Sequence, residues 1–289
     1  MDEFGTDDLC RERLTELRWP NGVACPRCGD MKHQYDSKRH TYDCAGCGYQ
    51  FSVTTGTMLH DTHLPLRKWF IATYLLCESK KSMSSMQIQR TIGVAKKTGW
   101  YLTHRIREAM KQAMAGEPLL DGANEVDETY IGGRVRGKGR GYVDNKTIVV
   151  GVKQRGGAIR MKVVDRNDRA TLHAFIREHI SPDAEVIYTD EWTAYRGIAD
   201  ENTRHETVNH RAEEWVRGPV HTNSIEGTWS LFNRAIVGSW HQVQRKHLDA
   251  YLKEMEWRQN NRDHPSLFTA TLKALMMAEA LEYKELIAS

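Results

Sequence analysis

The spacing of apolar residues predicts that the first part of the chain is mainly helical. Apolar positions recur every three to four residues within 1–19 and again over 64–77, which is the period of an amphipathic helix. Ser84 can cap a short helix that ends at Gly93, and a basic helix follows from Lys96. A short helix, a glycine turn and a basic helix are typical of a helix-turn-helix, whose second helix enters the major groove of DNA.

The second part of the chain changes to the pattern of strands. Apolar and β-branched runs predict strands over 124–131, 146–153 and 158–164, and Arg155-Gly-Gly indicates a hairpin between the last two. These are followed by a helix over 170–180, a buried strand over 185–189, a short helix over 192–198, a strand near 207–210 and a long helix from Asn223. Three antiparallel strands followed by strand–helix crossovers predict an α/β domain with a ribonuclease-H-like mixed sheet.

Four of the six cysteines form two Cys-x-x-Cys motifs. Cys25 and Cys28 are separated from Cys44 and Cys47 by fifteen residues, a spacing typical of zinc sites. Four thiolates complete a tetrahedral Zn2+ site and leave no position for a substrate, so the zinc would be structural. Two short strands are predicted between the motifs, and this arrangement is typical of a zinc ribbon. The alternative is a pair of disulfides, which suits a secreted protein.

Composition and charge narrow the class of protein further. The chain has 40% hydrophobic and 27% charged residues, which is the usage of a globular protein. No apolar run is long enough to span a membrane, and the first residues lack the apolar core of a secretory signal. The net charge is only +3, but eight Lys or Arg and a single acid lie within Lys80–Lys111 and again within Thr129–Arg160. Two basic stretches indicate a polyanionic partner, although each alone could be a solvated face.

Three carboxylates fall at the ends of predicted elements. Asp127 lies near the end of the first strand of the sheet, Asp190 directly follows the fourth, and Glu226 lies in the first turn of the last long helix. In the predicted sheet the first and fourth strands are neighbours, so we expect the three side chains to converge. Such a cluster suits Mg2+, which prefers oxygen ligands. Two such ions about 3.5–4 Å apart serve phosphodiester chemistry.

Each of these acids also has a simpler interpretation. Asp190 can cap the helix that follows it, and Asp127 can pair with the basic run Arg134-Arg136-Lys138-Arg140. Glu226 can form a capping box with Asn223, because the two are three residues apart at the start of a helix.

Seven ordered segments resemble the zinc-ribbon DDE transposases of bacterial insertion sequences, in the IS1595 family with an ISXO2-like transposase domain. They span residues 25–262 and are Cys25-Pro-Arg-Cys-Gly, the run from Tyr42 to Thr57, Val126-Asp-Glu-Thr-Tyr-Ile-Gly-Gly, Tyr188-Thr-Asp-Glu, Val208-Asn-His, His221-Thr-Asn-Ser-Ile-Glu-Gly and Trp257-Arg-Gln-Asn-Asn-Arg. The resemblance implies a DNA transposase that binds the terminal inverted repeats of its element. Such an enzyme cuts and joins DNA strands by two-metal phosphodiester transfer.

The resemblance also implies roles for the acidic residues. It assigns Asp127 and Asp190 to metal binding, with two Mg2+ or Mn2+ ions in each active site. The third ligand is Glu226 or Asn223, and the resemblance leaves both open. A carboxylate is the better ligand for a hard cation, which favours Glu226.

We expect DNA contacts from the basic helix, through Lys96, Lys97, Trp100 and Arg105. Family members often carry a basic residue seven positions after the glutamate, to hold DNA at the active site. Here the basic residue is Arg234, eight positions on, which places it about 100° further round the helix.

The expected order of domains is an N-terminal helix (1–19), a zinc ribbon (20–60), a helix-turn-helix region (61–115), the catalytic domain (116–262) and a C-terminal helix (263–289). We expect a cytoplasmic bacterial protein, nucleoid-associated when bound to DNA, with no membrane partner. Its partners would be the terminal repeats, target DNA and further copies of the chain on DNA.

Two other functions stay open: a catalytically inert or domesticated sequence-specific DNA-binding protein, and a ribonuclease-H-type nuclease or resolvase.

Overall fold

The computed structural model describes residues 4–132, 146–208, 218, 220–241 and 243–288. The chain forms two compact units, one made of Met1–Ala115 with His264–Ser289 and the other of Gly116–Asp263. The expected basic run over 134–140 and the residues of the Val208-Asn-His segment after Val208 lie outside the described residues. Within the described residues, no helix has the length and apolar character needed to cross a bilayer.

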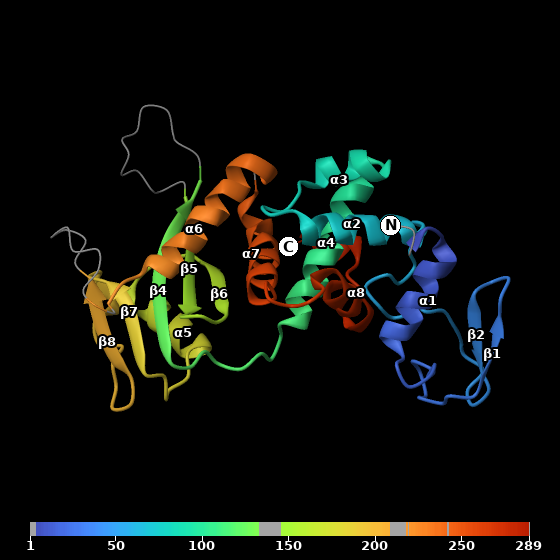
Figure 1. The fold of residues 1–289 in the computed structure, drawn as a ribbon, viewed down its shortest axis with the longest axis horizontal. Helices are drawn as coiled ribbons and strands as arrows, with labels where there is room; N and C mark the ends of the chain where they lie inside the picture. The colour runs from blue at the N-terminus through green and yellow to red at the C-terminus, as the bar shows by residue number, and fades with distance from the viewer. Residues whose placement is uncertain (1–3, 133–145, 209–217, 219, 242, 289) are drawn as a thin grey trace. The chain divides into compact units, whose positions relative to one another are not determined.

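The first unit joins a small sheet to a set of helices (Figure 1). Its strands are β1 (His33–Asp36), β2 (Thr41–Cys44) and β3 (Gln50–Phe51), and its helices are α1 (Asp7–Arg18), α2 (Leu66–Glu78), α3 (Ser85–Ile92), α4 (Lys96–Ala113), α8 (Leu267–Met277) and α9 (Tyr283–Ala288). β1 and β3 each pair antiparallel with β2, which gives the predicted ribbon.

The predicted helix-turn-helix is formed by α3, its glycine turn and α4. The Ser84 hydroxyl accepts the Gln87 N–H at the start of α3, and Gly93 ends the helix at φ +63°, the left-handed conformation that glycine adopts without strain. Gly99 of α4 sits against α3, where an added Cβ would come within 2.6 Å of Gln89 Cβ. The two helices therefore pack closely around the turn, as predicted.

The expected single C-terminal helix over 263–289 is wrong, because two helices form there. Residues 278–282 are good helix formers, but their backbone is bonded to α4 instead. The Glu279 N–H donates to Gln112 Oε1 at 2.8 Å, and the Tyr101 hydroxyl donates to the Leu281 carbonyl. Tertiary contacts thus override local helix propensity between α8 and α9.

The second unit is built on a five-stranded mixed sheet of order β6-β5-β4-β7-β8. Its strands are β4 (Ala123–Ile131), β5 (Thr147–Gln154), β6 (Ile159–Val164), β7 (Val186–Asp190) and β8 (Arg204–Val208). β4, β5 and β6 are antiparallel, whereas β7 runs parallel to β4 and β8 parallel to β7. Three antiparallel strands followed by two parallel ones beside the first strand make the predicted ribonuclease-H-like sheet.

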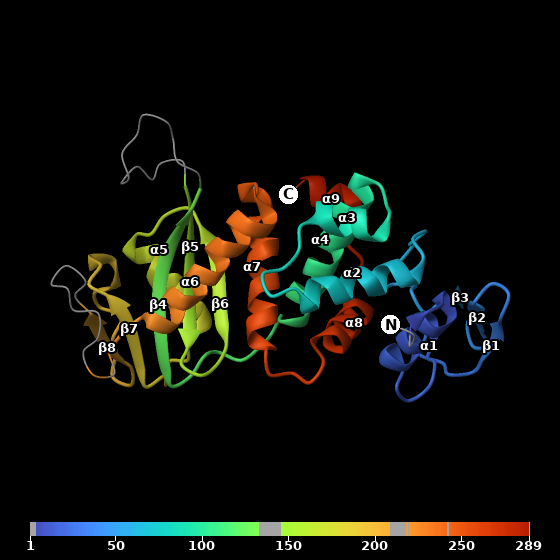
Figure 2. The same ribbon diagram turned by 45° about the horizontal axis from the view of Figure 1, so that its top comes forward.

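Helices cover both faces of this sheet (Figures 1 and 2). α5 (Arg169–His179) packs on one face, and α6 (Asn223–Ala235) and α7 (Arg245–Asn260) pack on the other. The unit also contains a short 3-10 helix, η2 (Thr193–Tyr195), and a short π-helix, η4 (Ile236–Trp240). One apolar core lies under α5 and another under α6 and α7. α6 therefore lies against β4 and β5, over the strand that carries Asp127.

The Trp257-Arg-Gln-Asn-Asn-Arg segment fastens α7 to the edge strand β6. The Asn260 side chain accepts the Ile159 N–H at 2.8 Å and donates to the Ile159 carbonyl at 3.2 Å. One turn earlier, the buried Glu256 accepts the Met161 N–H. These side chains satisfy backbone groups that an edge strand would otherwise leave unpaired.

Candidate functional site

The four cysteines of the ribbon meet at one point. Their sulfur atoms all lie within 4.8 Å of one another. Cys25 Sγ is 3.8 Å from Cys47 Sγ, and Cys28 Sγ is 3.5 Å from Cys44 Sγ. A tetrahedral Zn2+ with Zn–S bonds of about 2.3 Å sets its sulfurs about 3.8 Å apart, so the cluster fits a structural zinc ion. All four are free thiols, which excludes the two-disulfide alternative.

Each Cys-x-x-Cys motif closes in a glycine turn. Gly29 and Gly48 have φ of +78° and +67°, a region that favours glycine. Their N–H groups donate to the carbonyls of Cys25 and Cys44 at 2.9 and 3.0 Å. The two turns are alike, and each directs a pair of thiols to the common centre.

Asp127 and Asp190 lie on neighbouring parallel strands. The β4–β7 register pairs Glu125 with Tyr188, and two further residues along each strand bring Asp127 level with Asp190. Positions two apart on a strand share a face. That face is the one covered by α6, because Trp229 of α6 donates its indole N–H to Asp127 Oδ2 at 3.0 Å. The structure thus brings the two predicted aspartates together.

The surroundings of Asp127 disfavour its charged form. Burial is the main cause that raises the pKa of this carboxyl to about 8, and repulsion from Glu128 and Asp190 adds to it. The hydrogen bond from Trp229 acts in the opposite direction and lowers the pKa. A carboxyl with this pKa, beside other acids, is stabilised as the anion by a nearby cation.

Glu226 and Asn223 lie at the start of α6 and are both exposed. Thr222 is the cap residue and Asn223 the first helical residue, so the expected capping box of Asn223 and Glu226 is wrong. Instead, the Thr222 hydroxyl donates to Glu226 Oε1 at 2.9 Å.

The expected convergence of all three carboxylates stays a prediction. Among the described residues, only the cysteine cluster gathers three or more His, Cys, Asp or Glu ligand atoms within 4.8 Å of one another. Asp127 and Asp190 already repel each other, and a third carboxylate would add to this repulsion. Glu226 lies in the first turn of α6, the helix that contacts Asp127 through Trp229.

Glu128 is a further acid at this site that the sequence analysis did not single out. Tyr195 of η2 donates its hydroxyl to Glu128 Oε2. The pKa of Glu128 is raised, chiefly by burial and also by Asp190. Its position beside Asp127 in the sequence is a signal that could have found it, although adjacent residues of a strand point to opposite faces of the sheet.

The donor set at β4 and β7 fits a divalent cation. Asp127 and Asp190 offer carboxylate oxygens, the ligands that Mg2+ prefers. Besides burial, repulsion from Glu128 and Asp190 raises the pKa of Asp127, and a cation would relieve this repulsion. These two residues would hold such an ion.

Gly151 of β5 makes room for the tryptophan that contacts Asp127. It lies opposite Asp127 in the β4–β5 register, and an added Cβ would come within 2.6 Å of Trp229 Cη2. We expect Gly151→Ala to displace the indole and to lower the free energy of unfolding by about 1–3 kcal/mol. Urea unfolding measures this effect.

Gly227 supplies the matched control for that substitution. It lies on α6, but an added Cβ there would meet nothing within 4 Å. Gly227→Ala should therefore stabilise the protein by roughly 0.5–1 kcal/mol through helix propensity. Equal effects of the two alanines would contradict the close contact between Gly151 and Trp229.

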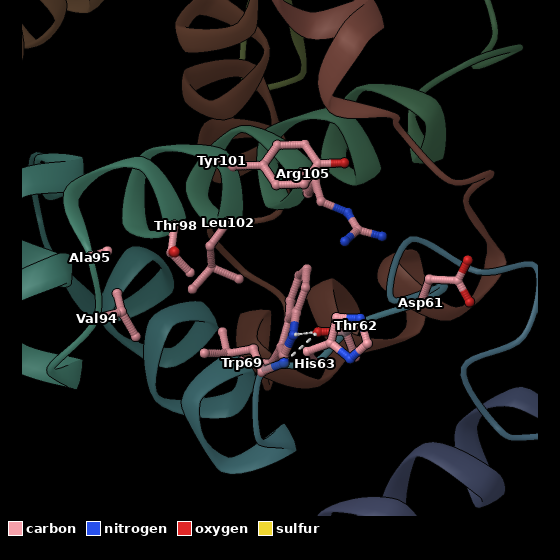
Figure 3. A pocket seen from close by; sticks show the side chains of 11 residues that line it. Asp61, Thr62, His63, Trp69, Val94, Ala95, Thr98, Tyr101, Leu102 and Arg105 are labelled. Atoms are coloured by element: carbon pink, nitrogen blue, oxygen red, sulfur yellow. Dashed lines mark hydrogen bonds between the residues drawn. The ribbon is translucent and has the colours of Figure 1, made fainter.

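Arg105, one of the expected DNA contacts, is largely buried. Its side chain is only 6% exposed, and its guanidinium lies 5.2 Å from the ring centres of both Trp69 and Tyr101. It lines a cavity of about 420 Å³ together with these rings (Figure 3). Its guanidinium also donates to the His60 carbonyl at 3.2 Å. Arg105 thus packs against Trp69 of α2, and its expected contact with DNA stays a prediction.

The other expected DNA contacts are more accessible. Lys96 and Lys97 are exposed in the first turn of α4, and Arg234 is exposed in the last turn of α6. Trp100 is half-buried, with its ring centre 4.5 Å from that of His104. Lys97 Nζ lies 4.1 Å above the ring of Tyr283. Lys96, Lys97 and Arg234 therefore remain candidates for phosphate contacts.

Comparison with known proteins identifies two domains. Residues 119–260 match the ISXO2-like transposase domain, and residues 5–50 match the transposase zinc-ribbon domain. An uncharacterized protein in transposable element ISH50 of Halobacterium salinarum is 29% identical over 275 residues, which cover 88% of this chain and 91% of that protein. An uncharacterized transposase-like protein of Haemophilus influenzae is 31% identical over 99 residues, or 34% of this chain and 78% of that protein.

Solved structures show only distant likeness. The Mos1 strand transfer complex shares 9% identity over 74% of this chain and 79% of that one, with a TM-score of 0.30. A pre-cleavage Mos1 transpososome shares 9% identity over 74% and 80%, with a TM-score of 0.27. At these scores the likeness carries no argument, and the fold rests on the strand order given above. With a zinc ribbon followed by an ISXO2-like domain, the chain belongs to the IS1595 family of insertion-sequence transposases.

Proposed function

We propose that this transposase binds the terminal inverted repeats of an insertion sequence and cuts and joins DNA strands with Mg2+ or Mn2+, two ions per active site. The observation that carries the proposal is the position of Asp127 and Asp190, each two residues beyond the Glu125–Tyr188 pair of adjacent parallel strands, together with the pKa of Asp127, which is raised to about 8. Structural carboxylates are seldom placed together under a helix unless a cation or a proton compensates them.

The chain's own groups have distinct tasks in this scheme. Asp127 and Asp190 bind the cations, and Trp229 fixes the orientation of the Asp127 carboxylate through its indole N–H. Glu226 is the preferred third ligand and Asn223 the alternative, since both lie in the first turn of α6. When bound, the two ions activate the attacking oxygen and stabilise the leaving oxygen of the phosphodiester.

The test of this function is strand cleavage and joining by the purified protein. We expect labelled DNA that carries the ends of the element to be cut and joined to target DNA with Mg2+ or Mn2+, and to stay intact with EDTA. DNA with scrambled ends is the control. Cleavage of both DNAs alike would favour a nuclease or resolvase instead.

The inert DNA-binding alternative shares the zinc ribbon and the helix-turn-helix with the proposed transposase. It predicts specific binding to the ends without cleavage under any divalent cation. The same assay therefore separates the two functions, because binding and cleavage are scored on the same labelled DNA.

Binding to DNA should depend on salt through the exposed lysines at the start of α4. Replacing Lys96 and Lys97 by alanine removes two cations that would contact phosphates. We expect the slope of log K against log salt to fall in magnitude by about two. Fluorescence anisotropy at several salt concentrations measures it.

The control pair is Lys273 and Lys284, which are exposed on α8 and α9 of the same unit. Their replacement by alanine should leave the slope unchanged. A slope that responds equally to both pairs would mean that α4 is not the DNA-binding helix.

A further inference from the structure

A buried glutamate on β4 holds the start of α6. Glu125 has no exposed surface, and its Oε2 accepts the N–H groups of Ser224 and Ile225 at 2.8 and 3.0 Å. Its Oε1 accepts the Ser224 hydroxyl at 3.1 Å. The first N–H groups of a helix have no partner within the helix, and the side chain of the cap residue Thr222 does not bond them. Glu125 therefore acts as the cap of α6, from a strand 99 residues earlier in the chain.

Two basic side chains of β5 and its hairpin complete this attachment. Arg155 donates to Glu125 Oε1 at 2.9 Å and to the His221 carbonyl at 2.9 Å, and its guanidinium stacks 3.9 Å from the ring centre of Tyr188. Lys153 donates to the Ser224 carbonyl at 3.2 Å. The carboxylate is thus paired as well as hydrogen-bonded, which a buried charge requires. The network ties α6 to three neighbouring strands.

α6 is held to β4 at a second point, and this point is in the acidic site. Trp229 of α6 donates to Asp127, two residues after Glu125 on the same face of β4. Two residues of a strand span about 6.6 Å, and the four residues from Ile225 to Trp229 span about 6 Å of helix. The spacings match, so the two attachments together fix both the position and the rotation of α6 along the strand.

We propose that Glu125 is a positioning residue for the acidic site: by capping α6 it sets the helix that carries Trp229, Asn223 and Glu226 over Asp127 and Asp190. The inference rests on the proposed function, because it concerns the cation held by the two aspartates. Glu226 lies between the two attachment points, directly after Ile225, so its backbone position is set by both. Loss of the cap would loosen the first turn of α6 and, through Trp229, the orientation of Asp127.

The test compares Glu125→Gln with Glu256→Gln. Glu256 is the matched control, because it is also a buried glutamate of this unit that accepts a backbone N–H and pairs with a lysine, Lys253. It joins α7 to β6 and not α6 to β4. Both substitutions keep the shape of the side chain and remove its charge.

Two readouts follow, and neither needs catalysis. Amide hydrogen exchange of Ser224 and Ile225 should become roughly five- to tenfold faster in Glu125→Gln, the size expected for a lost cap, and stay unchanged in Glu256→Gln. The Mn2+ affinity of the zinc-loaded protein, measured by calorimetry, should fall at least fivefold in Glu125→Gln alone. If Glu125 only stabilised the fold, the two substitutions would change Mn2+ affinity to the same extent.

The outcomes separate this inference from the proposed function. If the unsubstituted protein binds Mn2+ and Glu125→Gln binds it equally well, the positioning role is overturned while the proposed function stands. If the unsubstituted protein binds no Mn2+, the proposed cation site fails, and the positioning role fails with it. Faster exchange with unchanged Mn2+ affinity would leave Glu125 as a helix cap only and overturn the proposal.

Discussion

Asp127→Asn should lower strand cleavage and strand joining by several orders of magnitude, with binding to the element's ends retained. The substitution keeps the shape of the side chain but removes a carboxylate that we place on the cation. Asp190→Asn should have the same effect, because the two residues lie side by side on β4 and β7. Both reactions can be measured on one labelled DNA.

Asp165→Asn is the matched control, since Asp165 is an exposed acid of the same unit whose partner is Arg245 at the surface. It should react at the unsubstituted rate. Joining by Asp127→Asn at close to that rate would show that Asp127 has no part in the chemistry. Glu226→Gln and Asn223→Ala, assayed together, then decide which residue of α6 is the third ligand.

The stability of Asp127→Asn shows whether its inactivity reflects misfolding. The pKa of Asp127 is about 8 in the folded chain and about 4 when unfolded. Between these two pH values Asp127 carries a proton in the folded protein but not in the unfolded chain. Without divalent cations, the free energy of unfolding therefore falls as pH rises, by at most about 1.4 kcal/mol per pH unit. The asparagine variant lacks this group, so near pH 8 it should be more resistant to urea than the unsubstituted protein.

Replacing Cys25 and Cys44 by serine should remove the zinc and with it the fold of the ribbon. These two cysteines are buried and belong to different motifs. The variant therefore loses one zinc ligand from each motif. A closed four-thiolate site supplies most of the folding energy of a module this small. We expect about one zinc per chain in the unsubstituted protein, none in the variant, and weakened binding to the element's ends.

Cys10→Ser is the control for this change, because Cys10 is buried away from the cluster and belongs to neither motif. Metal analysis after removal of excess zinc should give one equivalent for it. Retention of zinc by the Cys25→Ser, Cys44→Ser variant would contradict the assignment of the cluster.

The order of elements could be predicted because local rules decide most of it. Ser84 and Gly93 mark the ends of α3 by cap and turn chemistry that is readable in sequence. Once the strands were placed, the ribonuclease-H-like order made β4 and β7 neighbours. The pairing of Asp127 with Asp190 then followed from the register of the sheet.

Contacts between distant residues could not be predicted in the same way. The local pattern suggested Asn223 as the cap of α6, whereas the cap is Glu125, and no local rule connects the two. The basic pattern of α4 also gave no sign that Trp69 of another helix packs against the guanidinium of Arg105. Glycine is needed at position 151 because Trp229 occupies the space that a side chain there would fill, and this contact is visible only in the structure.

The central claim is that Asp127 and Asp190 hold a divalent cation. Its most direct test is calorimetric titration of the zinc-loaded protein with Mg2+ or Mn2+. At pH 7 Asp127 is protonated in the metal-free protein, because its pKa is about 8, so binding of the cation must release a proton. Titrations in two buffers of different ionisation enthalpy count the protons. The account predicts close to one proton released at pH 7, nearly none at pH 9.5, and no release by Asp127→Asn. Binding without proton release at pH 7, or no binding at all, would contradict it.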